Sequence, residues 1–162
     1  MIIIRNLKGF LTKREFYNME RIMQEKISAD HLLYVSLKYT KTTDVILNLI
    51  TRWKSLIDIS IDRILEKAKK KKAISSIPIA PRMKIEKMKE IYKKNPIILE
   101  TMELHEFFKR VPGLEKIREN EFRKNVNIKV TDCGQLVTID MDKLKEYAAL
   151  IENFIIALKA II

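Results

Sequence analysis

The stretch "DVILNLITRWKSLIDISIDRILEKAKKKK", residues 44–72, determines the fold class that the sequence predicts. Apolar residues recur in it every three or four positions, so they lie on one broad face of an α-helix. The remaining positions, which include Asp58, Asp62 and Arg63, are expected on the solvent side. The pattern therefore predicts one long central helix over 44–72.

The segments before and after this helix show where the chain turns. Upstream, a helical pattern opens at Thr12 in "TKRE", where Thr12 and Glu15 have the spacing of a capping box. The sequence offers breaks near residues 28–30 and at 40–44 without choosing between them. Downstream, two prolines in 73–81 deny backbone donors and predict a crossover. Residues 12–72 are thus expected to form a long helical hairpin.

The second half of the chain predicts shorter elements. Short helices are expected over 82–124, as three pieces at about 82–94, 96–110 and 113–124, separated by prolines. Alternation in 126–139, with Gly134 free to take a positive φ, predicts a β-hairpin. A regular apolar stripe over 141–162, capped by Asp140 or Asp142, predicts a C-terminal helix.

These elements define a mostly α fold: a helical bundle built on a long helical hairpin, with one small β-hairpin before the C-terminal helix. The length of 162 residues fits a single domain, 1–162. The chain contains 33% charged residues and three glycines, which suits a compact helical protein. Its richness in Ile and Lys is typical of AT-rich and often thermophilic organisms.

The chain ends and the cysteine content predict a cytoplasmic protein. Cys133 is the single cysteine, so no disulfide can form within one chain. The apolar start "MIII", residues 1–4, is too short for a signal sequence, and it is either an edge strand or a segment docked on the bundle. The apolar end is interrupted by Glu152 and Lys159, so no membrane insertion is expected.

His105 is the first candidate for catalysis, because a histidine titrates near neutral pH and a carboxylate can orient it. Glu106 is the next residue and Arg110 lies five residues after His105 along the same helix, so the three form the candidate acid–base group. The alternative is a histidine on the surface of a helix. A zinc site of the H-E-x-x-H kind is excluded, since Lys109 stands at the second histidine position. No motif calls for a metal or any other cofactor.

Charge is the main functional signal. The net charge is +11, and residues 125–162 hold four lysines and five acidic residues, so residues 1–124 carry +12. A run of lysines could contact a phosphate backbone in a salt-dependent manner. A lysine run at a helix C-terminus is also what the helix dipole favours, which is the alternative explanation. The candidate nucleic-acid contacts are Lys67, Lys69, Lys70, Lys71, Lys72, Lys84 and Lys87.

Residues 29–68, "ADHLLYVSLKYTKTTDVILNLITRWKSLIDISIDRILEKA", resemble the helical-hairpin core of HEPN-type proteins. The resemblance implies a small α-bundle, often a homodimer, associated with toxin–antitoxin pairs or RNA processing. Many HEPN-type proteins cleave RNA through an Arg followed, after four to six residues, by a His. Nine residues separate Arg21 from His31, and no Arg lies four to six residues before His105. The resemblance therefore implies a non-catalytic member.

Three functions compete at this point. The first is an interaction or assembly module, expected to form a homodimer through apolar positions left over on the long helices or to bind another protein. Trp53 is either the anchor of that interface or a core residue. The second is a protein that binds RNA or DNA non-specifically without cleaving it. The third is a HEPN-like ribonuclease that uses His105.

Overall fold

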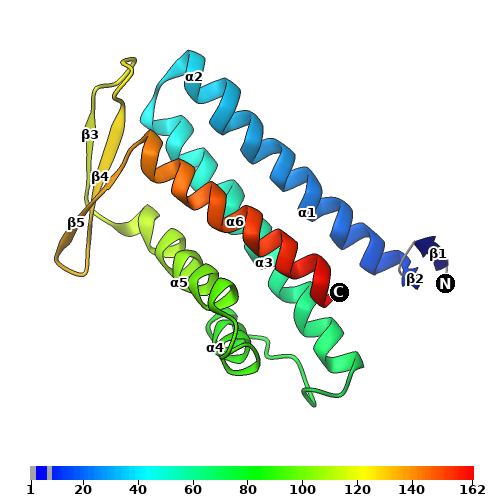
Figure 1. The fold of residues 1–162 in the computed structure, drawn as a ribbon. Coiled ribbons are helices and arrows are strands. Elements are labelled where there is room, and N and C mark those ends of the chain that lie inside the picture. The colour runs from blue at the N-terminus through cyan, green and yellow to red at the C-terminus, as the bar shows by residue number, and fades with distance from the viewer. Residues whose placement is uncertain (1–2, 7–8) are drawn as a thin grey trace.

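The protein is mostly α-helical in the computed structural model, which describes residues 3–6 and 9–162 and the side chains from residue 13 onward (Figure 1). The predicted fold class is confirmed: a long helical hairpin, shorter helices, and a small antiparallel sheet directly before the C-terminal helix. The elements are β1 Ile3–Asn6, β2 Gly9–Thr12, α1 Lys13–His31, a π-helical turn Leu32–Ser36, α2 Leu37–Thr40, α3 Thr43–Lys70, α4 Pro81–Ile91, α5 Pro96–Arg110, a 3-10 turn Val111–Gly113, β3 Lys116–Glu119, β4 Asn127–Asp132, β5 Gln135–Ile139 and α6 Met141–Ile161.

The chain start forms a strand pair, β1 with β2, and the helical hairpin follows it. Residues 1 and 2 of the apolar start lie outside the described residues, and so does the Thr12 side chain of the predicted capping box. Helical backbone then continues from Lys13 to Thr40 without a break at 28–30. The chain reverses at Lys41, which has φ 52°, and the Thr42 side chain accepts a hydrogen bond from the Val45 amide to begin α3.

Helix α3 lies at the centre of the molecule. It contacts α1, α4, α5, α6 and β4, and Figure 1 shows it running antiparallel to α1 with α6 alongside. The prediction of one long central helix is confirmed, with bounds within two residues of those expected. Its buried positions are Thr43, Ile46, Leu49, Ile50, Trp53, Leu56, Ile57, Ile59, Ser60, Ile61, Arg63, Ile64, Leu65 and Ala68.

Trp53 packs inside its own chain and not on an interface. Its side chain is 2% exposed, and its ring stacks on Phe108 of α5 at a centroid distance of 6.0 Å. The Tyr147 ring of α6 meets Trp53 edge-on at 6.4 Å, and burial raises the pKa of Tyr147 to about 12. These rings fasten three helices together, so the expectation that Trp53 anchors a second subunit is wrong.

The sheet has three strands in the order β3–β4–β5, one more than the predicted hairpin. The expected helix over 113–124 is wrong, because residues 116–119 pair with β4 instead. Ile117 and Phe122, two of the three apolar residues on which that helix was based, are 55% and 74% exposed. They supply no buried face that could hold a helix against the bundle.

The β4–β5 hairpin and the last helix follow the sequence closely. Asp132 pairs with Gln135 across a two-residue turn, in which Cys133 has φ 51° and Gly134 has φ 78°. Positive φ at both positions is what a type I′ hairpin turn requires. Asp140 rather than Asp142 caps α6, since its Oδ1 accepts a hydrogen bond of 2.9 Å from the Lys143 amide.

An ion pair is buried between α1 and α3. Arg63 was expected on the solvent side of the helix, but its side chain is only 1% exposed. Its Nη1 lies 3.6 Å from Oε1 of Glu15, which is also buried and forms a second ion pair with Lys70. The glutamate therefore compensates a guanidinium that has almost no access to water.

Replacing Glu15 by Gln is expected to lower the free energy of unfolding by about 3 kcal/mol, because the Arg63 charge would remain buried without its counter-charge. Arg63→Met removes the charge together with its desolvation cost, so it is expected to be close to neutral. Urea unfolding of both variants tests this. The exposed Glu20→Gln is the matched control, and an equal effect of Glu15→Gln and Glu20→Gln would contradict the interpretation.

Candidate functional site

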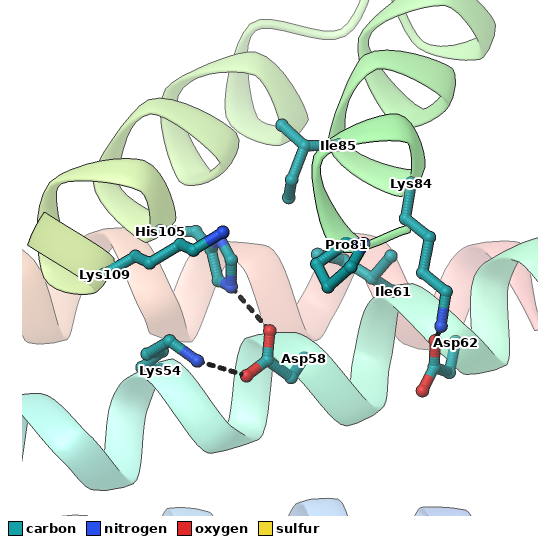
Figure 2. Close-up of a pocket in the computed structure, with 9 residues that line it drawn as sticks. All are labelled: Lys54, Asp58, Ile61, Asp62, Pro81, Lys84, Ile85, His105 and Lys109. Carbon is teal, nitrogen blue, oxygen red and sulfur yellow. Dashed lines mark hydrogen bonds and ion pairs between the residues drawn. The ribbon is translucent and has the colours of Figure 1, made fainter. Parts of the chain in front are cut away.

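A pocket of about 230 Å³ lies between α3, α4 and α5 (Figure 2). Its polar lining is charged: three lysines, two aspartates and a histidine surround a floor of aliphatic side chains. The lining residues are Lys54, Asp58, Ile61, Asp62, Pro81, Lys84, Ile85, His105 and Lys109.

His105 is the central polar residue of this pocket. It is 3% exposed, so the expectation of a surface histidine is wrong. Its Nε2 lies 2.6 Å from Oδ1 of Asp58, and Nζ of Lys54 lies 2.8 Å from Oδ2 of the same carboxylate (Figure 2). Asp58 thus receives one hydrogen bond at each oxygen, one from α5 and one from its own helix.

The electrostatics of Asp58 favour a carboxylate. Burial raises the pKa of Asp58, but the hydrogen bonds and charges of His105 and Lys54 outweigh it, and the net pKa is lowered. Because an ionised carboxylate only accepts hydrogen bonds, Nε2 of His105 carries the hydrogen of this bond and is its donor.

The same geometry leaves His105 poorly placed for acid–base chemistry on a ligand. Its Nε2 is engaged by Asp58, and its Nδ1 is sealed from solvent without a hydrogen-bond partner in the described part of the chain. A general base must reach the proton that it removes. Neither nitrogen of His105 is open to a molecule in the pocket.

The other two candidates of the acid–base group are directed elsewhere. Glu106 forms an ion pair of 3.0 Å with Lys89 of α4. Arg110 makes a two-point contact with Asp132 of β4, at 2.9 and 3.0 Å, which raises the pKa of Arg110. The structure therefore separates His105, Glu106 and Arg110, which tie α5 to α3, to α4 and to the sheet respectively.

The candidate lysines fall into two groups. Lys70, Lys84 and Lys87 have acidic partners, which are Glu15, Asp62 and Glu90. Among the described residues, no acidic group lies within ion-pair distance of the other four, Lys67, Lys69, Lys71 and Lys72. We call these four residues the lysine end.

The lysine end has an ordered backbone. The Lys72 amide donates to the Lys69 carbonyl, and the Ala73 amide donates to the Ala68 carbonyl, at 3.0 and 2.9 Å. This is the Schellman pattern, in which the residue after the cap is left-handed and is usually glycine. Here that residue is Lys72, with φ 60°. The motif fixes the direction in which the last lysines leave the helix.

Sequence reasoning missed the role of Asp58. Its pairing with Lys54 is visible in the sequence as an i, i+4 contact. Its pairing with His105 spans 47 residues and depends on how α5 docks on α3, so no local signal announces it.

Comparison with protein-family models, with curated proteins and with solved structures finds no match to this chain. In the described part of the chain, no helix is both long and apolar enough to cross a bilayer. The described residues also hold no group of three or more histidine, cysteine, aspartate or glutamate side chains arranged to bind a metal ion.

Replacing His105 by Ala is expected to lower the free energy of unfolding by about 2–4 kcal/mol, because it empties a buried site and removes a partner of Asp58. Lys109→Ala changes the same pocket without breaking an ion pair among described residues, so about 0.5 kcal/mol or less is expected. Urea unfolding measures both variants. Equal effects would contradict a structural role for His105.

The lowered pKa of Asp58 also predicts a pH dependence. A carboxyl group whose pKa is lower in the folded state stabilises the protein at neutral pH, and this stabilisation is lost as the pH falls through the folded-state pKa. Asp58→Asn is therefore expected to be less stable than the parent at pH 7, with a difference that shrinks toward the acid limb. Unfolding curves at several pH values measure this, and a difference that grows in acid would contradict it.

Proposed function

We propose that the protein binds nucleic acid non-specifically, through the lysine end, and does not cleave it. The observation that carries this proposal is the distribution of ion pairs. Four neighbouring lysines are left without acidic partners in the described structure, while Lys70, Lys84 and Lys87 are compensated. Concentrated uncompensated charge is what a phosphate backbone recognises.

The ordered helix end adds to this proposal. Lys69, Lys71 and Lys72 are exposed, and the backbone that carries them is held by the Schellman hydrogen bonds. Three exposed cations within four positions of an ordered turn are suited to contacts with more than one phosphate. The helix dipole explains why cations are favoured at the end of α3. It does not explain why a lysine, Lys72, occupies the left-handed position that glycine usually takes.

The two alternatives are ranked lower for separate reasons. The ribonuclease alternative needs an accessible His105, whose two ring nitrogens are engaged or sealed. The interaction-module alternative expected a self-association surface of apolar positions left over on the long helices, and the anchor suggested for it, Trp53, is buried against Phe108. The resemblance to HEPN-type proteins stays a hypothesis, and it agrees with the proposal in implying a member without the Arg and His pair.

The test is fluorescence anisotropy of labelled RNA and duplex DNA at about 50 and 200 mM salt. The variant carries Lys69→Glu, Lys71→Glu and Lys72→Glu, and it spares Lys70 because that residue pairs with the buried Glu15. Parent affinity is expected to fall by orders of magnitude between the two salt concentrations, and the variant is expected to bind at least tenfold more weakly.

The matched control carries Lys94→Glu, Lys109→Glu and Lys145→Glu, which changes the net charge by the same amount at exposed lysines that likewise have no acidic partner among the described residues. Equal weakening in both triple variants would mean that overall charge, and not the lysine end, controls binding. Absence of binding at the lower salt concentration would overturn the proposal.

We also propose a cytoplasmic location and a homodimer. The free and exposed Cys133 suits a reducing compartment. A homodimer would need a surface other than Trp53, and light scattering at tens of micromolar is expected to give twice the chain mass of 19.1 kDa. A monomer at that concentration would overturn the dimer without affecting the nucleic-acid proposal.

A further inference from the structure

The connection between β3 and β4 holds an unusual backbone. Asn120 and Phe122 have φ 57° and 64°, and Lys41, in the turn between α2 and α3, has φ 52°. The Phe122 amide donates a hydrogen bond of 2.8 Å to the Lys41 carbonyl, which joins the connection to the turn between α2 and α3. A positive φ is rare for a residue as bulky as phenylalanine.

Polar contacts on one side hold this conformation in place. The buried Thr43, the first residue of α3, donates its amide to Oε1 of Glu121 at 3.1 Å, and its hydroxyl hydrogen-bonds the same carboxylate. Arg118 donates to the Thr43 hydroxyl at 3.0 Å and to Asp44 at 2.7 Å. The connection is therefore clamped to the N-terminus of α3, and Phe122 has little freedom to relax.

The strained residue contributes no packing to the core. The Phe122 side chain is 74% exposed, and Tyr39, in the helical turn before Lys41, is 78% exposed. Burial of an aromatic ring is what normally stabilises a fold, and neither ring is buried. Strain that is held rigidly and not offset by packing is typical of a binding surface.

Cations neighbour the two aromatic residues in the chain. Lys38 and Lys41 flank Tyr39, and Arg123 and Lys124 follow Phe122 in the chain; none of the four has an acidic partner among the described residues. The Lys38 ammonium lies 6.0 Å from the centroid of the Tyr39 ring. We call these six residues the aromatic corner: Lys38, Tyr39, Lys41, Phe122, Arg123 and Lys124.

The acidic residues nearby are already engaged. Asp44 pairs with Arg118, Glu119 pairs with Lys129, and Glu121 accepts from Thr43. Glu121 keeps its charge, since Thr43 is neutral, but no ion pair joins it or the other two acids to the four cations of the aromatic corner in the described residues. Exposed rings amid uncompensated cations match a ligand that offers flat aromatic faces and negative charge together.

We propose that the aromatic corner binds single-stranded nucleic acid, with unpaired bases stacking on Phe122 and Tyr39 and the four cations contacting the adjoining phosphates. Bases of a single strand expose their faces, whereas those of a duplex are stacked on one another. This inference rests on the proposed nucleic-acid binding and adds a preference for unpaired strands. It also assigns a second contact point, because the lysine end lies at the opposite end of α3.

The test measures affinity for a labelled oligouridine of about twenty nucleotides and for a duplex RNA of equal length. Both probes are longer than the stretch of nucleotides that one single-strand-binding fold covers. The variants are Phe122→Ala, Tyr39→Ala and the double variant. Removing either ring is expected to weaken single-strand binding about five- to tenfold, because one stacked base loses its partner. The affinity for duplex RNA is expected to change less than about twofold. Leu136→Ala is the matched control, because Leu136 is an exposed apolar residue of β5 outside the corner.

Two further readouts separate stacking from other effects. The slope of affinity against salt concentration is expected to stay unchanged in the ring variants and to fall in the Arg123→Glu and Lys124→Glu double variant. Phe122→Gly relieves the backbone strain, so its melting temperature is expected to rise while its single-strand affinity falls as in Phe122→Ala.

The possible failures are distinguishable. If the protein binds duplex and single strands but the ring variants leave single-strand affinity unchanged, the inference is overturned and the proposed function stands. Equal weakening for both probes likewise overturns it. If neither probe binds the parent protein, both proposals fail together.

Discussion

The burial of one broad face of α3 is the constraint on which the rest of the structure depends. The charged residues of this 28-residue helix lie almost entirely outside that face, which packs against α1, α4, α5 and α6. Arg63 is one of its charged residues that is nevertheless enclosed, and Glu15 must come from α1 to compensate it. The hairpin of α1 and α3 therefore has its register fixed by electrostatics as well as by apolar packing.

Helix α5 shows how charged residues that suggest catalysis can serve architecture. His105, Glu106 and Arg110 reach three different partners, in α3, α4 and β4. Buried or half-buried polar contacts of this kind specify one docking geometry, because any other placement of α5 would leave partners unsatisfied. The pocket beside His105 is a consequence of this docking, with its carboxylates already neutralised.

Local patterns in the sequence were sufficient for the elements that depend on local chemistry. The period of 44–72, the turn at Gly134 and the cap of the last helix all act within a few residues. The structure has the first two where they were predicted, and it selects Asp140 from the two caps that the sequence offered. The helix expected over 113–124 failed because strand pairing with β4 competes with a weak helical pattern. Pairing partners are distant in sequence, so periodicity cannot reveal them.

The candidate site was predictable only in part, for the same reason. The run of lysines is visible in the sequence, but which of them are compensated depends on Glu15, Asp62 and Glu90 being brought close. The burial of His105 and Arg63 is likewise set by partners on other helices. The left-handed conformation of Phe122 follows from the clamp on α3, and no residue type announces it.

Trp53 is the single tryptophan of the chain, and it lies where α3, α5 and α6 meet. Its indole emission therefore comes from one known environment, between the rings of Phe108 and Tyr147. Both proposed contact surfaces are at the ends of α3, away from this ring cluster in its interior. The fluorescence of Trp53 therefore reports on the packing of the three helices. The residue that emits it is far from the two proposed contact surfaces at the ends of α3.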